Sequence, residues 1–254
     1  MIMNILLRAL LICSMLFAGP LVLAESGQTE KTQIETVQAE TAQAVLAALA
    51  LSDIIEVMRQ EGLAQAVDVT GGFLPSTAAV AWRRDLDAIY DVNWMKATVA
   101  AHFARELGDA DMSDVLAFLT STDGKRLVAL EVSARQAMSD ASIEDAARSV
   151  YRTSGDASDA RRDLVATFIS RNDMVAANVK SALHASFSYY RGLRESGALE
   201  MSDREIIDEV WATEAETRSE TSEWLHAFLW MAYAALDNSV VAEYSALSAT
   251  GAGQ

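Results

Sequence analysis

The side chains of this chain that could do acid–base or metal chemistry are three histidines and 36 carboxylates. The most suggestive arrangement is the segment Glu223–His226, because two Glu-x-x-His segments and two further Glu residues hold the di-metal centre of some helical bundles. A second such segment is missing, since Val99 and Ser181 stand three residues before the other two histidines. The sequence therefore predicts no metal site, and it predicts that His226 lies in a helical core.

The other two histidines have polar neighbours. His102 precedes Glu106 by four residues, a spacing that favours a surface ion pair. His184 shares a helical flank with Lys180 and Arg191, so we expect it in solvent.

Motifs of nucleophilic catalysis and of phosphate binding are missing from the sequence. There is no Gly-x-Ser-x-Gly elbow and no Ser-x-x-Lys, and the single cysteine, Cys13, stands near the N-terminus. Gly71-Gly72 is not followed by the lysine of a phosphate loop. We therefore predict no catalytic residue, no cofactor and no enzymatic activity. The alternative is a metal-dependent or carboxylate-dependent hydrolase that uses His226 and nearby Glu residues.

Residues 1–24 have the features of a cleavable signal peptide. Arg8 is their only charged side chain, an apolar run follows it, and Val22-Leu23-Ala24 ends in a small residue that signal peptidases prefer. The apolar run is too short to cross a bilayer comfortably. We expect cleavage after Ala24 and a periplasmic or secreted mature protein without cysteine and without a membrane span.

The balance of charges is strongly acidic. The chain carries a formal net charge of −16, and removal of Arg8 with the signal peptide makes the mature chain more negative. Nucleic acids and anionic membranes bind clusters of Lys and Arg, and the basic clusters here are only pairs such as Arg83-Arg84. The charge therefore argues against nucleic acid as a partner. The carboxylates between Asp203 and Glu223 are expected to form a solvated acidic face on a helix.

Apolar side chains recur at the period of an α-helix along most of the chain. From Trp82 to Leu107 and from Val175 to Leu193 their mean spacing is about 3.6 residues. Runs that alternate as in strands are missing, and alanine, a strong helix former, is frequent. The sequence predicts an all-α protein, a bundle of roughly eight to ten helices in two halves without a sheet. We expect the Trp82–Leu107 stripe to face a core.

Loop-forming residues and helix-start signals indicate how the chain is organised. We expect a polar leader and a weak first helix at 25–50, a first helical half at 51–155 and a second at 156–254, joined by the linker Gly155–Ser158. Capping boxes at Ser142 and Ser202 predict helix starts, the second for a long helix that reaches Leu236.

The segment Phe118–Lys125, with the sequence Phe-Leu-Thr-Ser-Thr-Asp-Gly-Lys, combines helix-ending and helix-starting residues. Ser121 and Asp123 can accept hydrogen bonds from backbone N–H groups at a helix end, and Gly124 can adopt a positive φ. We predict a structural hinge built on Phe118, Ser121, Gly124 and Lys125, with a ligand-binding role as the weaker alternative.

This segment resembles the signature of a bacterial family known as domain of unknown function 2059, in which two aromatic residues lead into Ser-Pro-x-Gly-Lys. Leu119 replaces the second aromatic residue and Thr122 replaces the proline, while the Phe-x-x-Ser-x-x-Gly skeleton is kept. The resemblance covers about residues 80–140 and implies an exported helical domain without a stated activity. A weaker copy of the pattern, from Leu247 to Gly251, leads to the hypothesis that the second half repeats the first.

The segment from Trp224 to Leu236 is apolar on nearly all sides. Such a helix lies in the middle of a core or lines an apolar groove. The candidate groove residues are Trp224, Phe228, Trp230 and Tyr233. Together with the missing catalytic groups, this concentration of aromatic residues favours a non-enzymatic envelope protein that binds a protein partner or an apolar ligand.

Overall fold

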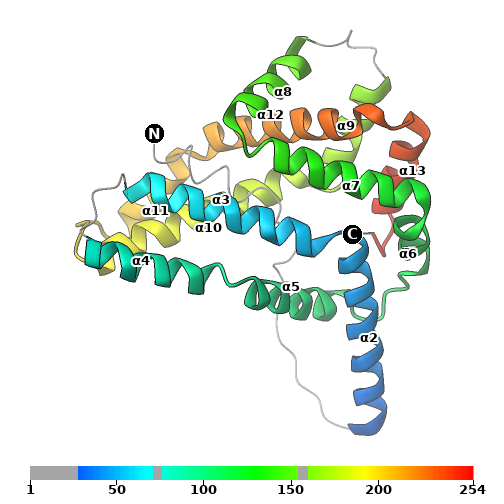
Figure 1. The fold of residues 1–254 in the computed structure, drawn as a ribbon, viewed down its shortest axis with the longest axis horizontal. Helices are drawn as coiled ribbons and strands as arrows, with labels where there is room; N and C mark the ends of the chain where they lie inside the picture. Colours follow the sequence, from blue (N-terminus) through cyan, green and yellow to red (C-terminus); the bar gives the residue numbers. More distant parts are fainter. Residues whose placement is uncertain (1–27, 71–75, 154–159, 254) are drawn as a thin grey trace. The chain divides into compact units, whose positions relative to one another are not determined.

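A computed structural model of the protein describes residues 28–70, 76–153 and 160–253. In these ranges the chain is helical and contains no strand, which confirms the all-α fold class (Figure 1). The predicted signal peptide 1–24 and the predicted linker Gly155–Ser158 lie outside the described residues. The elements are α2 (Gln28–Ala48), α3 (Leu51–Thr70), α4 (Ser76–Ile89), α5 (Val92–Leu107), α6 (Ser113–Thr120), α7 (Thr122–Ala137), α8 (Ala141–Thr153), α9 (Ala160–Arg171), α10 (Met174–Glu195), α11 (Asp203–Ala212), α12 (Glu214–Ala232), the 3-10 helix η1 (Tyr233–Ala235) and α13 (Asn238–Ser248).

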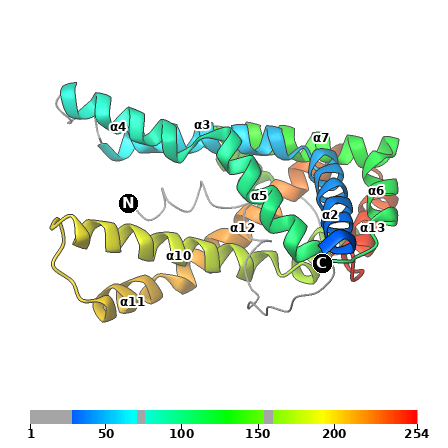
Figure 2. The same ribbon diagram turned by 90° about the horizontal axis from the view of Figure 1, so that it is seen from below.

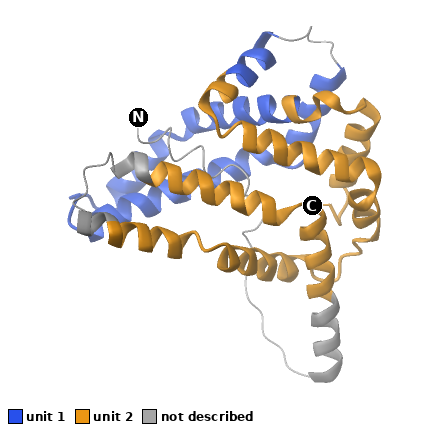
Figure 3. Cartoon of the chain, in the orientation of Figure 1, with its two compact units in different colours: residues 1–15, 146–230 blue, residues 16–145, 231–254 orange. Residues whose placement is uncertain are grey.

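The described residues form two compact units (Figure 3). Unit 1 comprises residues 146–230, from α8 to α12. Unit 2 comprises the described part of residues 16–145 together with residues 231–253, so that η1 and α13 join α2 to α7. We call residues 231–253 the C-terminal segment. Unit 2 is therefore built from two stretches of chain that are far apart in the sequence.

In unit 2, α5 packs against α2 and α3, and α7 packs against α3, α6, η1 and α13 (Figures 1 and 2). The polar leader expected at 25–50 is already helical from Gln28. Its Gln, Glu and Ala residues are good helix formers, which explains why a segment with little apolar periodicity is part of a long helix.

The apolar stripe from Trp82 to Leu107 is divided between two helices. Tyr90 and Asp91 separate α4 from α5, and the Asp91 carboxylate accepts a hydrogen bond from the backbone N–H of Trp94 at 2.7 Å. Of the stripe, only Leu86 is buried, and α5 has no fully buried residue. The prediction that the stripe faces a core is therefore wrong for α4 apart from Leu86, whereas it holds in part for α5, whose stripe residues are partly buried where that helix packs against α2 and α3.

In unit 1, α10 packs against α9 and α11. The predicted capping box at Ser202 is present, with its hydroxyl accepting from the N–H of Glu205. The long helix expected after it ends at Ala212, because Thr213 interrupts it and donates its hydroxyl to the carbonyl of Val210 at 2.8 Å. Such bonds from Thr to a preceding carbonyl bend or interrupt helices.

No single helix among the described residues has both the length and the apolar composition that a membrane crossing needs. One bent pair, Gln38–Ala48 with Leu51–Ala66, meets these criteria by length and composition.

Candidate functional site

The turn between α6 and α7 is a single residue, Ser121, in an extended conformation. Its N–H donates to the carbonyl of Phe118 at 3.0 Å, and its hydroxyl accepts from the N–H of Gly124 at 3.0 Å. Ser121 thus closes one helix and caps the next, using backbone groups that both helix ends leave unpaired.

Gly124 is required for close packing rather than for a special backbone conformation. It lies in the first turn of α7 and is not among the positive-φ glycines of the described residues, so the expected positive φ is wrong. A Cβ atom at Gly124 would lie within van der Waals distance of the Phe118 carbonyl oxygen and 2.8 Å from the Cα of Leu119. Only a residue without a side chain lets the start of α7 approach the end of α6 this closely.

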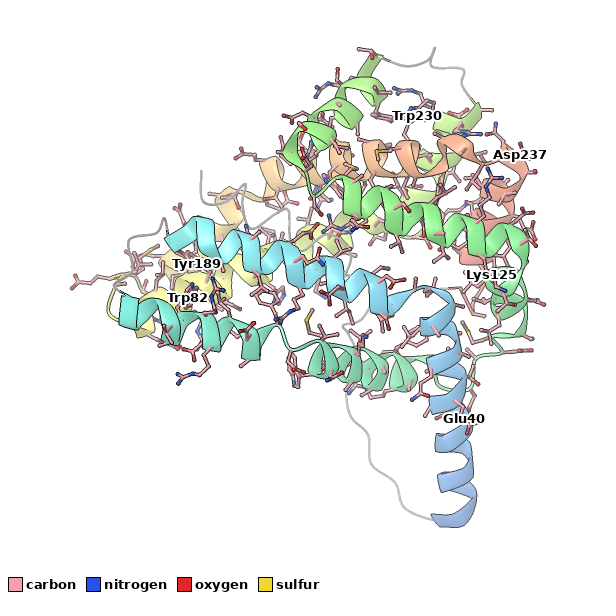
Figure 4. The ribbon with its side chains drawn as sticks, viewed as in Figure 1. Glu40, Trp82, Lys125, Tyr189, Trp230 and Asp237 are labelled. Carbon is pink, nitrogen blue, oxygen red and sulfur yellow. The ribbon has the colours of Figure 1, made fainter. Side chains whose placement is uncertain are left out.

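The other two hinge residues point in different directions. Phe118 is buried, and its ring stacks on that of Tyr244 in the C-terminal segment, with ring centroids 5.6 Å apart. Lys125 is exposed on the first turn of α7 (Figure 4). The predicted hinge therefore has one side in the core of unit 2 and one side in solvent.

A second turn, Leu247–Gly253, repeats two hydrogen bonds of the first. The N–H of Thr250 donates to the carbonyl of Leu247 at 3.1 Å, and the Thr250 hydroxyl accepts from the N–H of Gly253 at 3.1 Å. A Cβ at Gly253 would collide with the Leu247 carbonyl oxygen and the Cα of Ser248, the positions that correspond to Phe118 and Leu119. The weak sequence copy therefore extends two residues beyond Gly251, and its glycine is Gly253.

Beside the first turn, a partly buried carboxyl group joins α7 to the C-terminal segment. Tyr233 of η1 has no exposed surface, and its hydroxyl donates to Oε1 of Glu131 at 2.6 Å. Burial raises the pKa of Glu131 to about 7, while the Tyr233 hydrogen bond lowers it less strongly. Burial and the nearby Glu131 also raise the pKa of Tyr233 and of Tyr244, so both phenols stay protonated. One turn earlier on α7, Arg126 donates to the carbonyl of Ala235 at 2.8 Å.

Glu131 and Tyr244 were not recognised as site residues from the sequence, although a signal for Glu131 was present. Leu127, Ala134 and Met138 are buried and share a helix face with Glu131. A carboxylate in line with apolar residues at helical spacing is a buried acid or a break in the pattern. No sequence pattern predicts the contact between Tyr244 and Phe118, because the two residues come together only in the folded structure.

Three of the four candidate groove residues are buried. Trp224 and Phe228 stack with ring centroids 5.0 Å apart in unit 1, and Tyr233 is buried in unit 2. Trp230 is partly exposed (Figure 4). The apolar groove stays a prediction.

His226 lies in unit 1 and is partly exposed, beside an aromatic and basic cluster. Its Nδ1–H donates to the carbonyl of Ser222 at 2.7 Å, which leaves Nε2 as the basic nitrogen. The ring of Tyr151 lies 5.4 Å from its ring, and the Arg162 guanidinium lies over Tyr151 at 4.1 Å. The nearby carboxylate Glu223 is bonded to Arg152 at 2.5 Å. Within the described ranges, no three His, Cys, Asp or Glu side chains are placed to hold a metal ion together.

The other two histidines belong to helix surfaces. His184 is exposed on α10, as expected. His102 on α5 has its Nδ1 2.7 Å from the Arg105 guanidinium, and Arg105 also pairs with Glu106 at 3.3 Å. His102, Arg105 and Glu106 therefore form a series of polar contacts along α5.

One part of the chain matches a known protein family. Residues 93–152 match the model of a family described as "Uncharacterized protein conserved in bacteria (DUF2059)". This stretch runs from α5 to α8 and contains the turn at Phe118–Lys125, so it confirms the resemblance drawn from that segment. The match covers less than half of the chain and carries no activity with it. No curated protein and no solved structure matches the chain.

Proposed function

We propose that this protein is an exported, non-enzymatic envelope module that binds a protein partner through α11. The observation that carries the proposal is a pair of large apolar side chains on one side of that helix. Ile207 is 42% exposed, and Trp211, one turn later, is 63% exposed. The buried side of the same helix is already occupied by Ile206 and Val210. The Ile207–Trp211 pair is therefore a second apolar surface, beyond the one that the fold uses.

Exposed tryptophan is a characteristic feature of binding surfaces. Trp combines a large apolar area with little conformational entropy, and it is enriched among the residues that dominate interface energies. Side chains four residues apart on a helix form a convex ridge, which fits a groove on another protein, whereas small molecules bind in concave pockets. The partner class that fits this ridge is therefore a protein.

The charges around the pair indicate what the rim of the partner contains. Asp203 and Asp208 are exposed on α11, and Arg204 lies 4.0 Å from Asp208. The neighbouring first turn of α12 is also acidic, with Glu214 and Glu216. A partner groove with apolar walls and Lys or Arg at its rim complements this surface.

Export is the second part of the proposal and rests on residues 1–24. Their single charge, apolar run and small residue at position 24 support secretion and signal-peptide cleavage. The mature chain that remains has no cysteine and needs no disulfide in an oxidising compartment.

Site-specific photo-crosslinking in living cells tests the proposal. A photoreactive amino acid replaces Trp211 in one variant and Trp94 in a matched control, because Trp94 on α5 is 62% exposed. We expect a discrete adduct from position 211 in the envelope fraction and none from position 94. Adding Ile207→Ser should abolish the adduct while leaving the melting temperature unchanged.

The adduct also reports the identity of the partner. An adduct of twice the mass of the chain identifies a second copy as the partner, and another mass identifies a different protein. Absence of any adduct at position 211 from cells that export the protein would refute binding through α11. An equal yield from both positions would show that crosslinking follows exposure alone.

A further inference from the structure

We propose that Glu131 is a protonation-dependent latch that holds the C-terminal segment on α7. The contact joins residues 102 positions apart in the sequence. The C-terminal segment is a separate stretch of chain from residues 16–145 of unit 2, and such a segment can open locally while the rest of a fold stays folded.

The latch consists of three contacts between α6 or α7 and the segment. The Tyr233 hydroxyl donates to Glu131 at 2.6 Å, the Tyr244 ring stacks on Phe118, and Arg126 donates to the Ala235 carbonyl at 2.8 Å. Only the first of these involves a group that titrates near neutral pH.

The surroundings of Glu131 determine the direction of the effect. Glu131 is partly buried between α7 and the C-terminal segment, so its ionised form loses part of its hydration, while the neutral phenol of Tyr233 donates a hydrogen bond to it. Desolvation is accordingly the largest influence on the Glu131 pKa, and it brings the pKa to about 7.

The charged groups on the helices that pack against α7 are engaged elsewhere or lie in solvent. Arg135 of α7 is bonded to Glu61 of α3 at 2.5 Å, and Arg59 of α3 is bonded to Asp87 at 2.8 Å. On η1 and α13 the titratable groups that face Glu131 are the phenols of Tyr233 and Tyr244. The remaining charged side chains of these elements are exposed: Asp53, Glu56, Asp114, Asp123, Lys125 and Glu243.

The sign of the pH effect follows from these surroundings. The folded-state pKa lies above the ordinary value of 4.5. The detached segment exposes Glu131 to water, so ionisation favours detachment. Attachment is therefore strongest below about pH 4.5 and weakens as the pH rises towards 7, by at most about tenfold per pH unit.

Hydrogen exchange of the full-length protein, followed by mass spectrometry at pH 5 and pH 8 and corrected for intrinsic exchange rates, tests the latch. We expect the protection of amides in α13 to fall by up to about a hundredfold between the two conditions in the wild type. The neutral variant Glu131→Gln should keep the same protection at both pH values. Peptides from α9 and α10 serve as internal references.

Two further variants keep the test decisive. Tyr233→Phe removes the donor that lowers the Glu131 pKa, so the fall in protection should extend to higher pH. Glu243→Gln, an exposed change on α13, should behave as the wild type. Equal pH profiles for wild type and Glu131→Gln would overturn the proposal. If Glu131→Gln fails to fold, an unchanged profile for Tyr233→Phe would overturn it.

Discussion

Gly124 and Gly192 show how differently two helical glycines respond to an added methyl group. At Gly124 the new Cβ meets the backbone of α6, which cannot move away as a flexible side chain could. At Gly192 on α10 nothing lies within 4 Å of the same position. The two residues therefore form a matched pair for testing the turn.

We expect Gly124→Ala to lower the free energy of unfolding by about 1–3 kcal/mol, the usual effect of forcing extra volume into a packed site. Gly192→Ala should raise it by about 0.5–1 kcal/mol, because alanine favours the helix. Urea denaturation followed by circular dichroism measures both. Similar effects from the two substitutions would mean that α6 and α7 do not meet as closely as the structure indicates.

Individual residues were predicted from the sequence where their role is local. The Ser202 cap and the exposure of His184 depend on neighbours within one helical turn. Gly124 was recognised for the wrong reason, because its constraint comes from six residues earlier and appears only when two helices are placed together. The stacking of Phe118 on Tyr244 was not predicted for the same reason.

Among helices, the two similar turns make a testable pair. Gly253→Ala should loosen the end of α13 because its Cβ would collide with the Leu247 carbonyl, whereas Gly251→Ala meets nothing within 4 Å. We expect faster hydrogen exchange of the Leu247–Gly253 amides in the first variant only. If both variants exchange alike, the likeness of the two turns is superficial, and the hypothesis of a sequence repeat loses its structural support.

A buried ion pair connects α3 to α7. The Arg135 side chain is 3% exposed and lies 2.5 Å from Glu61, and Glu144, also buried, interacts with it electrostatically. Arg135→Met removes the guanidinium bonded to the largely buried Glu61 carboxylate, so we expect a loss of about 3–5 kcal/mol in the free energy of unfolding. Adding Glu61→Gln should recover part of that loss in thermal unfolding. No recovery would show that Arg135 acts through packing alone.

The residue at which a helix begins was predicted less accurately than the presence of the helix. Ser142 was expected as a cap, but Asp140, two residues earlier, accepts the hydrogen bond of the Ser142 N–H group. The hydrogen bond from the Ser142 hydroxyl, followed by those from the backbone N–H groups of Ser142 and Ile143, lowers the pKa of Asp140. Ser and Asp are both strong capping residues, so a sequence with the two close together does not determine which one caps.

At the scale of the molecule, export is the prediction with the most direct test. The N-terminus of protein purified from its native cell should be Glu25, and the protein should be released with the periplasmic or secreted fraction. Ala24→Tyr should block processing, because signal peptidases need a small residue there. A mature protein that still begins with Met1 would contradict the prediction.

Residues 231–253 form one unit with the helices before residue 146. Unit 2 therefore cannot be completed until residues 231–253 have been synthesised. A ribosome delivers the chain from its first residue onward, so α6 and α7 emerge long before Tyr233 and Tyr244. Until residues 231–253 have been synthesised, the face of Phe118 that Tyr244 stacks on remains open to water and to other chains. A chain that terminates after unit 1 would therefore keep this apolar surface exposed and would be prone to aggregate. Chaperones and proteases act on products of this kind.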